Sequence, residues 1–256
     1  MTQGGGDVMA LRSLAAVVAS ATLLLAPTAA YGDDDLSARQ LADEAKRNLL
    51  DADSVHLELT DDSTGASAST TQPASMDLTL DRDGNCVGSM EMGADGGSVE
   101  IVKQGDEVWM KPDTAFWKAQ VPGAQGDAVA ELFKNRYIHG STDDAMLKGM
   151  ADTCDLTAFQ REAAGDDSGK AALTKGAETT VDGTKVVPLT GEEDGKKAVL
   201  YITSDSPHRL VKATQQGDGT DLTLAFSRYD EPVPTATPSA DETVDVSKLQ
   251  QELQSI

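Results

Sequence analysis

The sequence predicts an α+β fold in which a curved antiparallel β-sheet (a half-barrel) is covered on its concave face by an N-terminal helix and a helical insertion. Three observations lead to this prediction. A helical pattern of apolar residues spans 33–52, strand-like alternation begins at residue 54, and helical stretches at 126–134 and 141–163 interrupt it until residue 178. Strands on both sides of a helical segment, joined by short turns, favour one sheet with an insertion over two domains. About ten strands are expected, and an open sheet of that size curls.

The first 32 residues resemble an export signal. Arg12 supplies a positive charge ahead of the apolar run 14–26, which is too short to span a bilayer comfortably. Ala30 and Gly32 are small residues at the positions that a signal peptidase reads. A retained membrane helix is the alternative interpretation.

These features predict three regions. Residues 1–32 form a signal peptide, with Met9 as a second possible start, 33–230 form a single domain, and 231–256 form a Pro-rich tail that packs along an edge or frays. The protein is therefore expected outside the cytoplasm, either secreted or associated with the membrane through an uncleaved signal.

The composition excludes some partners. The formal net charge is -22 at pH 7 and the sequence pI is about 4.3. Such a charge repels nucleic acid and anionic lipid surfaces, so neither is an expected partner, and a soluble monomer is expected.

The two cysteines, Cys86 and Cys154, both lie in the exported part of the chain. Two thiols in an oxidising compartment predict one disulfide, which would stabilise the fold by about 4 kcal/mol in the chain-entropy model. A free, reactive pair is the alternative, and the sequence contains no CxxC motif.

The N-terminal helix is predicted from apolar residues at helical spacing, and Ser37 with Gln40 has the spacing of a capping box. The spaced apolar residues are Leu36, Leu41, Ala45, Leu49 and Ala52.

Two groups of strands are predicted from period-two alternation and turn residues such as Asp83-Gly84 and Asp182-Gly183. The first group comprises 54–60, 76–81, 86–92, 96–103, 106–111 and, as a further edge, 115–121. The second group comprises 178–191, 197–205, 208–216 and 221–230.

Ser204, Asp205 and His208 lie close together in the sequence and are the residue types of a hydrolase triad. The alternation on both sides instead places "SDSP" at the tip of a hairpin, where Ser, Asp and Pro are ordinary turn residues. No GxSxG elbow is present. No catalytic residue is therefore predicted, and the protein is not expected to be an enzyme.

No metal site and no cofactor are predicted either. His56, His139 and His208 are scattered without an HExxH motif, with His56 on the polar side of its strand and His139 in a connection after a helix. The segment 79–91 resembles a calcium loop but has Thr79 and Met90 at two ligand positions. Aromatic residues make up only 4% of the chain, which disfavours a carbohydrate site.

The apolar residues are more informative about function. Most of the eight Met residues fall on predicted strand or helix faces, and Met forms adaptable surfaces for irregular apolar ligands. Trp109 is out of phase with Val108 and Met110, so its strand has apolar groups on both faces. Filling of the core is the alternative role for each of these residues.

The order of these features resembles that of the LolA-like superfamily, and in particular the actinobacterial LprG and LppX lipoproteins. The resemblance rests on "GDEVWMKP", "VDGTKVVPLTG", "AVLYITSDSPHRLVKA" and "LTLAFSRYDEPVPTATPSADETV". It implies a half-barrel that holds acyl chains beneath its helices, with no catalytic residues. The sequence departs from these relatives in one respect, since no lipid-attachment Cys follows the signal.

The expected function is therefore binding of an apolar ligand, a lipid or acyl chain, between sheet and helices. The predicted lining comprises Met76, Leu78, Met90, Trp109, Trp117, Met146, Met150, Leu200 and Leu224. The alternative is a cell-envelope interaction or sensor module with a filled core and an acidic surface that binds a membrane or cell-wall protein. A secreted hydrolase is the third hypothesis.

Overall fold

The computed structural model describes residues 36–64, 72–121, 123–165, 172–193 and 195–246. The predicted signal peptide lies outside these residues. The chain divides into two compact units, each made of two chain segments. Unit 1 comprises Met1–Ala52 and Thr157–Phe226, and unit 2 comprises Asp53–Leu156 and Ser227–Ile256.

Unit 1 contains an antiparallel sheet with the strand order β12-β11-β10-β9-β7, and β8 also pairs with β9. The strands are β7 (Thr174–Lys175), β8 (Thr179–Val181), β9 (Thr184–Glu193), β10 (Lys196–Thr203), β11 (Leu210–Gly217) and β12 (Thr220–Ser227). Hairpin turns join β8 to β9, β10 to β11 and β11 to β12, as the turn residues predict.

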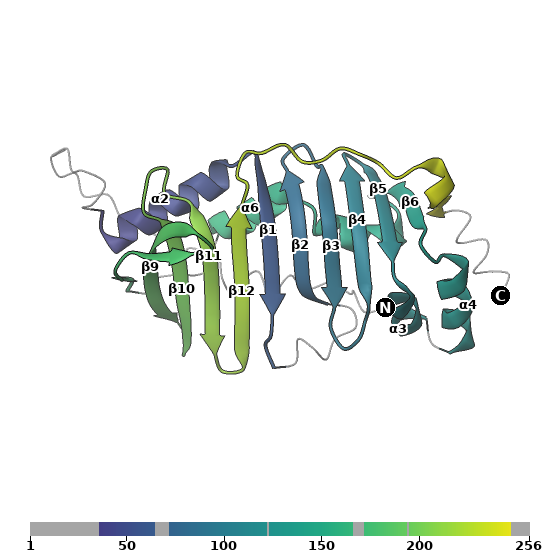
Figure 1. Cartoon of the computed structure of the whole chain (residues 1–256), viewed down its shortest axis with the longest axis horizontal. Helices are drawn as coiled ribbons and strands as arrows, with labels where there is room; N and C mark the ends of the chain where they lie inside the picture. Colours follow the sequence, from purple (N-terminus) through teal and green to yellow (C-terminus); the bar gives the residue numbers. More distant parts are fainter. Residues whose placement is uncertain (1–35, 65–71, 122, 166–171, 194, 247–256) are drawn as a thin grey trace. The chain divides into compact units, whose positions relative to one another are not determined.

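Two helices pack on the sheet of unit 1 (Figure 1). Helix α2 (Ala38–Asp51) contacts β10 and β11, and helix α6 (Leu156–Gly165) contacts β12 through Phe159 and Phe226. The predicted capping box of α2 is confirmed, because Ser37 accepts from the backbone N–H of Gln40 and the Gln40 side chain accepts from that of Ser37. The buried residues of α2 are Leu41, Ala42, Ala45 and Leu49.

Unit 2 contains a sheet with the strand order β13-β6-β5-β4-β3-β2-β1. The strands are β1 (Ser54–Asp61), β2 (Pro73–Asp81), β3 (Cys86–Met92), β4 (Ser98–Gln104), β5 (Glu107–Pro112), β6 (Tyr137–Ser141) and β13 (Thr243–Asp245). All pairs are antiparallel except β13 with β6. The parallel strand β13 shows that part of the C-terminal tail packs along an edge.

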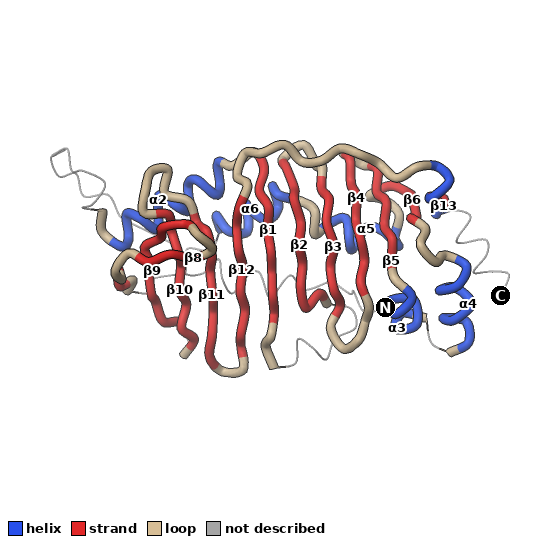
Figure 2. Tube along the Cα trace, viewed as in Figure 1, coloured by secondary structure: helices blue, strands red, loops and turns tan. Residues whose placement is uncertain are grey.

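The helices of unit 2 are α3 (Thr114–Gln120), α4 (Ala124–Leu132), α5 (Ala145–Asp152) and the short 3₁₀ turn η3 (Ala240–Glu242) (Figure 2). Helix α3 corrects the strand expected at 115–121. Asp113 is the reason, because its carboxylate accepts from the backbone N–H of Phe116 and caps a helix that buries Phe116 and Trp117.

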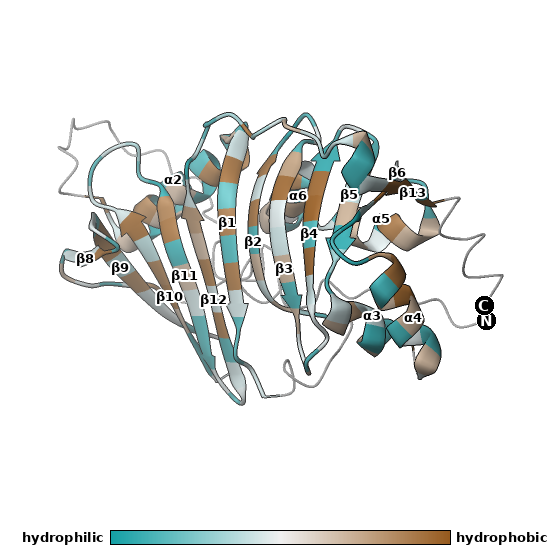
Figure 3. Cartoon of the chain, turned by 45° about the vertical axis from the view of Figure 1, so that its right-hand side comes forward, coloured by the Kyte–Doolittle hydropathy of each residue, from teal (hydrophilic) through white to brown (hydrophobic). Residues whose placement is uncertain are grey.

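A second correction concerns His139, which lies in β6 and not in a connection after a helix. The predicted α+β fold with mainly antiparallel strands is confirmed, and so is the Cys86–Cys154 disulfide. Along individual strands such as β1 the hydropathy alternates, which is the period-two pattern read from the sequence (Figure 3). Among the described residues, no helix combines the length and apolarity that crossing a bilayer requires.

Candidate functional site

The sheet of unit 2 has one apolar face, which we call the apolar face of unit 2. The strand register brings its side chains into cross-strand rows that are buried. Its members are Val55, Leu57, Leu59, Met76, Leu78, Leu80, Cys86, Met90, Val99, Ile101, Val108, Met110 and Ile138.

Three of the predicted lining residues lie together on this face. Met76 is directly opposite Met90 in the β2–β3 pairing, and Leu78 is on the same face of β2. All three are buried. Strand phase places Met76 and Leu78 on one face of β2, and the register adds Met90 as their neighbour on β3.

Helix α5 covers part of this face and is linked to it at its C-terminal end. Cys86 is bonded to Cys154, which follows α5, and the hydroxyl oxygen of Thr153 lies 3.6 Å from the sulfur of Met90. A Cβ atom at Gly140 in β6 would lie 2.8 Å from the Cδ1 atom of Leu147. The absence of a side chain at Gly140 therefore allows α5 to approach the sheet closely.

Met146 and Met150 lie one helical turn apart on α5, beside its buried residues Leu147 and Ala151. Both methionines are only half-buried. On this helix, each of these two predicted lining residues therefore has apolar surface packed against the protein and apolar surface exposed to solvent.

Trp117 belongs to a separate aromatic cluster. It lies on α3 with its ring 5.9 Å from those of Phe116 and Phe133, and it is buried. Within the part of the chain that the structure describes, its indole Nε1 has no hydrogen-bond partner. A buried N–H without an acceptor is energetically costly.

Trp109 lies on the opposite face of the sheet from Met76, Leu78 and Met90, since it is out of phase with Val108 and Met110. Its ring stacks on that of His139 at 4.7 Å, and the His139 Nε2 atom lies 2.5 Å from a carboxylate oxygen of Glu107. Trp109 thus belongs to a polar and aromatic surface.

Three residues on the same surface, Glu100, Lys111 and Tyr137, are in contact, and the pKa values of Lys111 and Tyr137 are shifted. Glu100 accepts from the hydroxyl of Tyr137 at 2.8 Å and pairs with the ammonium of Lys111 at 2.7 Å. Burial, together with the hydrogen bond and charge of Glu100, raises the pKa of Tyr137. Burial by itself lowers the pKa of Lys111, but its contacts with Glu100 and Tyr137 outweigh this and raise it.

The two remaining lining residues, Leu200 and Leu224, belong to unit 1. Leu200 is opposite Leu189 on β9 and Ala213 on β11, and Ala213 is opposite Leu224 on β12. These side chains form one buried row on the sheet. Leu200 and Leu224 therefore share a face within unit 1.

The turn between β10 and β11 contains Ser204 and His208, and its predicted hairpin position is confirmed. The two side chains do not form a Ser–His pair, because His208 Nδ1 donates to the carbonyl of Thr203 at 2.9 Å and Ser204 Oγ has no hydrogen-bond partner among the described residues. The nucleophile–base contact of a hydrolase triad is thus absent at this turn.

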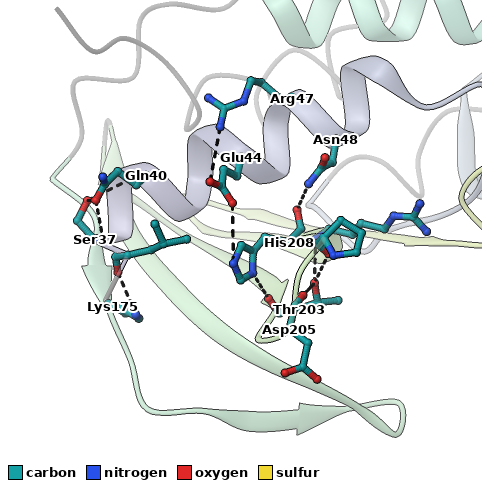
Figure 4. Close-up of polar contacts among 12 residues, drawn as sticks. Ser37, Gln40, Glu44, Arg47, Asn48, Lys175, Thr203, Asp205 and His208 are labelled. Carbon is teal, nitrogen blue, oxygen red and sulfur yellow. Dashed lines mark hydrogen bonds and ion pairs between the residues drawn. The ribbon is translucent and has the colours of Figure 1, made fainter. Parts of the chain in front are cut away.

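His208 has a structural role that the sequence did not reveal, because its side chain is only 2% exposed. Its carbonyl accepts from the side-chain amide of Asn48 on α2 at 2.6 Å, and its Nε2 atom lies 3.8 Å from a carboxylate oxygen of Glu44 (Figure 4). The hairpin and α2 are joined through these contacts.

The structure also assembles a group that the sequence analysis missed. His56 Nε2 lies 3.0 Å from Glu58 Oε1 and 3.7 Å from Asp77 Oδ1. The sequence signal is a His-x-Glu pattern on one strand and an Asp-x-Thr pattern on the next. It becomes recognisable only with the register that sets Glu58 opposite Asp77.

Comparison with known proteins supports the fold. No family profile matches the chain, and no curated protein matches it by sequence. Among solved structures, LprF from Mycobacterium bovis aligns with a TM-score of 0.50 and 14% identity over 79% of this chain and 97% of its own. At this identity the match shows a shared fold and nothing further about activity.

Two other similar structures have lower TM-scores. The Mycobacterium tuberculosis lipoprotein LppX has a TM-score of 0.47 and 16% identity over 77% of this chain and 96% of its own. The LolA superfamily protein NE2245 from Nitrosomonas europaea has a TM-score of 0.23 and 12% identity over 78% of this chain and 95% of its own. The LprF match, with its TM-score of 0.50, supports the predicted resemblance at the level of the fold.

Proposed function

We propose that this protein is an exported, non-enzymatic binding protein that holds acyl chains of a lipid against the apolar faces of its sheets. The observation that carries the proposal is the row of Met and Leu side chains, Met76, Leu78 and Met90, beneath a short helix with two half-buried methionines. Each buried CH2 group of a ligand contributes about 0.8 kcal/mol, so such a face needs few polar contacts for useful affinity. The fold shared with LprF is consistent with this role.

The direct test is native mass spectrometry of protein purified from its own host, combined with titration of a fluorescent fatty acyl probe. A bound mass that fragments into acyl products, and saturable probe uptake, are the expected results. Recovery of ligand-free protein that also fails to take up the probe would contradict the proposal.

A pair of variants on α5 tests which surface binds the chain. Met146→Glu with Met150→Glu should weaken probe binding by about tenfold or more, because burial of a Met side chain is worth about 1.5–3 kcal/mol and the new charges resist desolvation. Ala145→Glu adds the same type of charge at an exposed position of α5 and serves as the matched control. Equal affinity in all three proteins would exclude α5 from the binding surface.

A second candidate is the interaction module with a filled core, since most of the predicted lining side chains are already buried against the protein. This function uses the acidic surface to bind a membrane or cell-wall protein. Absence of probe uptake together with salt-sensitive binding of an envelope protein would favour it.

A further inference from the structure

The face of unit 2 opposite its apolar face carries three potential metal ligands at one place. His56 and Glu58 are two residues apart on β1, so their side chains point to the same face, and Glu58 is directly opposite Asp77 on β2. Their ligand atoms, one imidazole nitrogen and two carboxylate oxygens, all lie within 4.8 Å of one another. The backbone pairing of two strands therefore holds all three residues in place.

The distances suit a small transition-metal ion. Bonds of about 2.0–2.1 Å at tetrahedral angles place neighbouring ligand atoms roughly 3.3 Å apart. The separations of His56 Nε2 from Glu58 Oε1 and from Asp77 Oδ1 are 3.0 and 3.7 Å, on either side of this value.

Burial and charge favour a cation at the same point. The His56 side chain is 6% exposed and so is fixed in orientation, whereas those of Glu58 and Asp77 are 59% and 63% exposed and leave the position open to solvent. Like charges directly opposite each other on neighbouring strands are destabilising. A dication between the two carboxylates relieves this repulsion.

The contacts of the other imidazole nitrogen of His56, Nδ1, define which hydrogen bonds must change when a metal ion binds. His56 Nδ1 lies 3.0 Å from the hydroxyl oxygen of Thr79 and 2.5 Å from Nη2 of Arg228, an exposed residue. Guanidinium can only donate, so Nδ1 accepts and the ring proton is on Nε2, where Glu58 accepts it. Coordination through Nε2 requires the proton to move to Nδ1, where the Thr79 hydroxyl accepts it while Arg228 turns to solvent.

We propose that His56, Glu58 and Asp77 bind one divalent transition-metal ion, with zinc as the best match to one imidazole and two carboxylate ligands, and that Arg228 competes with it. The nitrogen ligand disfavours calcium and magnesium, which take oxygen ligands. Three protein ligands leave one position of a tetrahedral ion for water. This site lies on the other face of the sheet from the acyl-binding surface and does not depend on it.

The test is calorimetric titration of the untagged full-length protein with zinc chloride, and with calcium chloride for comparison. Wild type should bind one zinc ion, and the signals of the His56 ring in nitrogen-15 NMR should shift. Glu58→Gln with Asp77→Asn should weaken binding about 10- to 100-fold or more. Arg228→Ala should tighten it by about tenfold, the effect expected of one positive charge beside a dication at a surface.

The matched control is Asp83→Asn with Glu91→Gln, which removes two other exposed carboxylates of unit 2 and should leave zinc affinity unchanged. All substituted positions are exposed, so the variants should fold, which circular dichroism checks. No zinc binding by wild type or Arg228→Ala overturns the proposal. Binding that Glu58→Gln with Asp77→Asn leaves intact, or calcium binding of equal strength, also overturns it.

Discussion

At the scale of single residues, the ionisation of Tyr137 reports on the polar surface of unit 2. Its hydroxyl donates to Glu100, and both burial and this contact raise its pKa above the ordinary value near 10. The Lys111 ammonium lies 4.9 Å from the centre of its ring, and the pKa of Lys111 is also raised. The three groups therefore form one linked system at alkaline pH.

We predict that Tyr137 ionises only above pH 10, seen as the difference in phenolate absorbance between wild type and Tyr137→Phe. Glu100→Gln should shift this ionisation to lower pH, because it removes the carboxylate that opposes a second negative charge. Since the folded-state pKa values are raised, the associated stability is complete below pH 10. It is lost as the pH rises through the raised values. A titration that Glu100→Gln leaves unchanged would contradict this linkage.

Residue roles were the least predictable property of this sequence. His56 and Glu58 could be assigned to the polar side of one strand, but Asp77 joins them only through register, which depends on pairing of distant segments. His208 was placed at the start of a strand, yet it lies in the turn before β11, and its side chain is buried beside Glu44 of α2. Local patterns do not record contacts between residues so far apart in the chain.

At the scale of elements, the close approach of β2 and β3 depends on a glycine. A Cβ atom at Gly88 would lie 1.9 Å from the backbone carbonyl oxygen of Asp77 and 2.9 Å from Cα of Leu78. Backbone atoms cannot move aside as a flexible side chain can. The two strands that present Met76, Leu78 and Met90 therefore require glycine at this position.

We predict that Gly88→Ala lowers the free energy of unfolding by about 3 kcal/mol or more, measured by urea denaturation, because the strands must separate. Gly149→Ala is the control, and it is expected to raise the free energy of unfolding. Gly149 is exposed on α5 with no atom within 4 Å of an added Cβ, so alanine should stabilise by about 0.5–1 kcal/mol. Equal effects of the two changes would show that the strand contact is not tight.

Elements were predictable wherever a local signal determined them. Asp-Gly turns predicted hairpins, and helical spacing at 126–134 and 141–163 predicted helices α4, α5 and α6. The strand expected at 115–121 was wrong because adjacent Phe116 and Trp117 fit either period, and the decisive signal was the cap at Asp113. A helix cap outweighs a short apolar pattern, because the capping side chain accepts a hydrogen bond from a backbone N–H that would otherwise have no partner at the start of the helix.

At the scale of the whole molecule, the fold class followed from the order of alternating and helical segments, but the division into units did not. Each unit combines two segments that are separated in the chain, such as Met1–Ala52 with Thr157–Phe226. Segment order along the sequence carries no direct record of such pairing. Whether 33–230 behaves as one cooperative domain stays a prediction.

The net charge of -22 should control the rate at which this protein encounters a membrane surface. We predict that uptake of a fluorescent acyl probe in 10 mM salt is faster from neutral phosphatidylcholine vesicles than from vesicles containing 30% phosphatidylglycerol. The anionic surface repels an acidic protein over a screening length of about 30 Å at that salt concentration. In 0.5 M sodium chloride the two rates should converge, whereas sucrose of equal osmolality should leave the difference intact. Equal rates at low salt would mean that the charge does not control the encounter, and that uptake is limited by a later step on the protein.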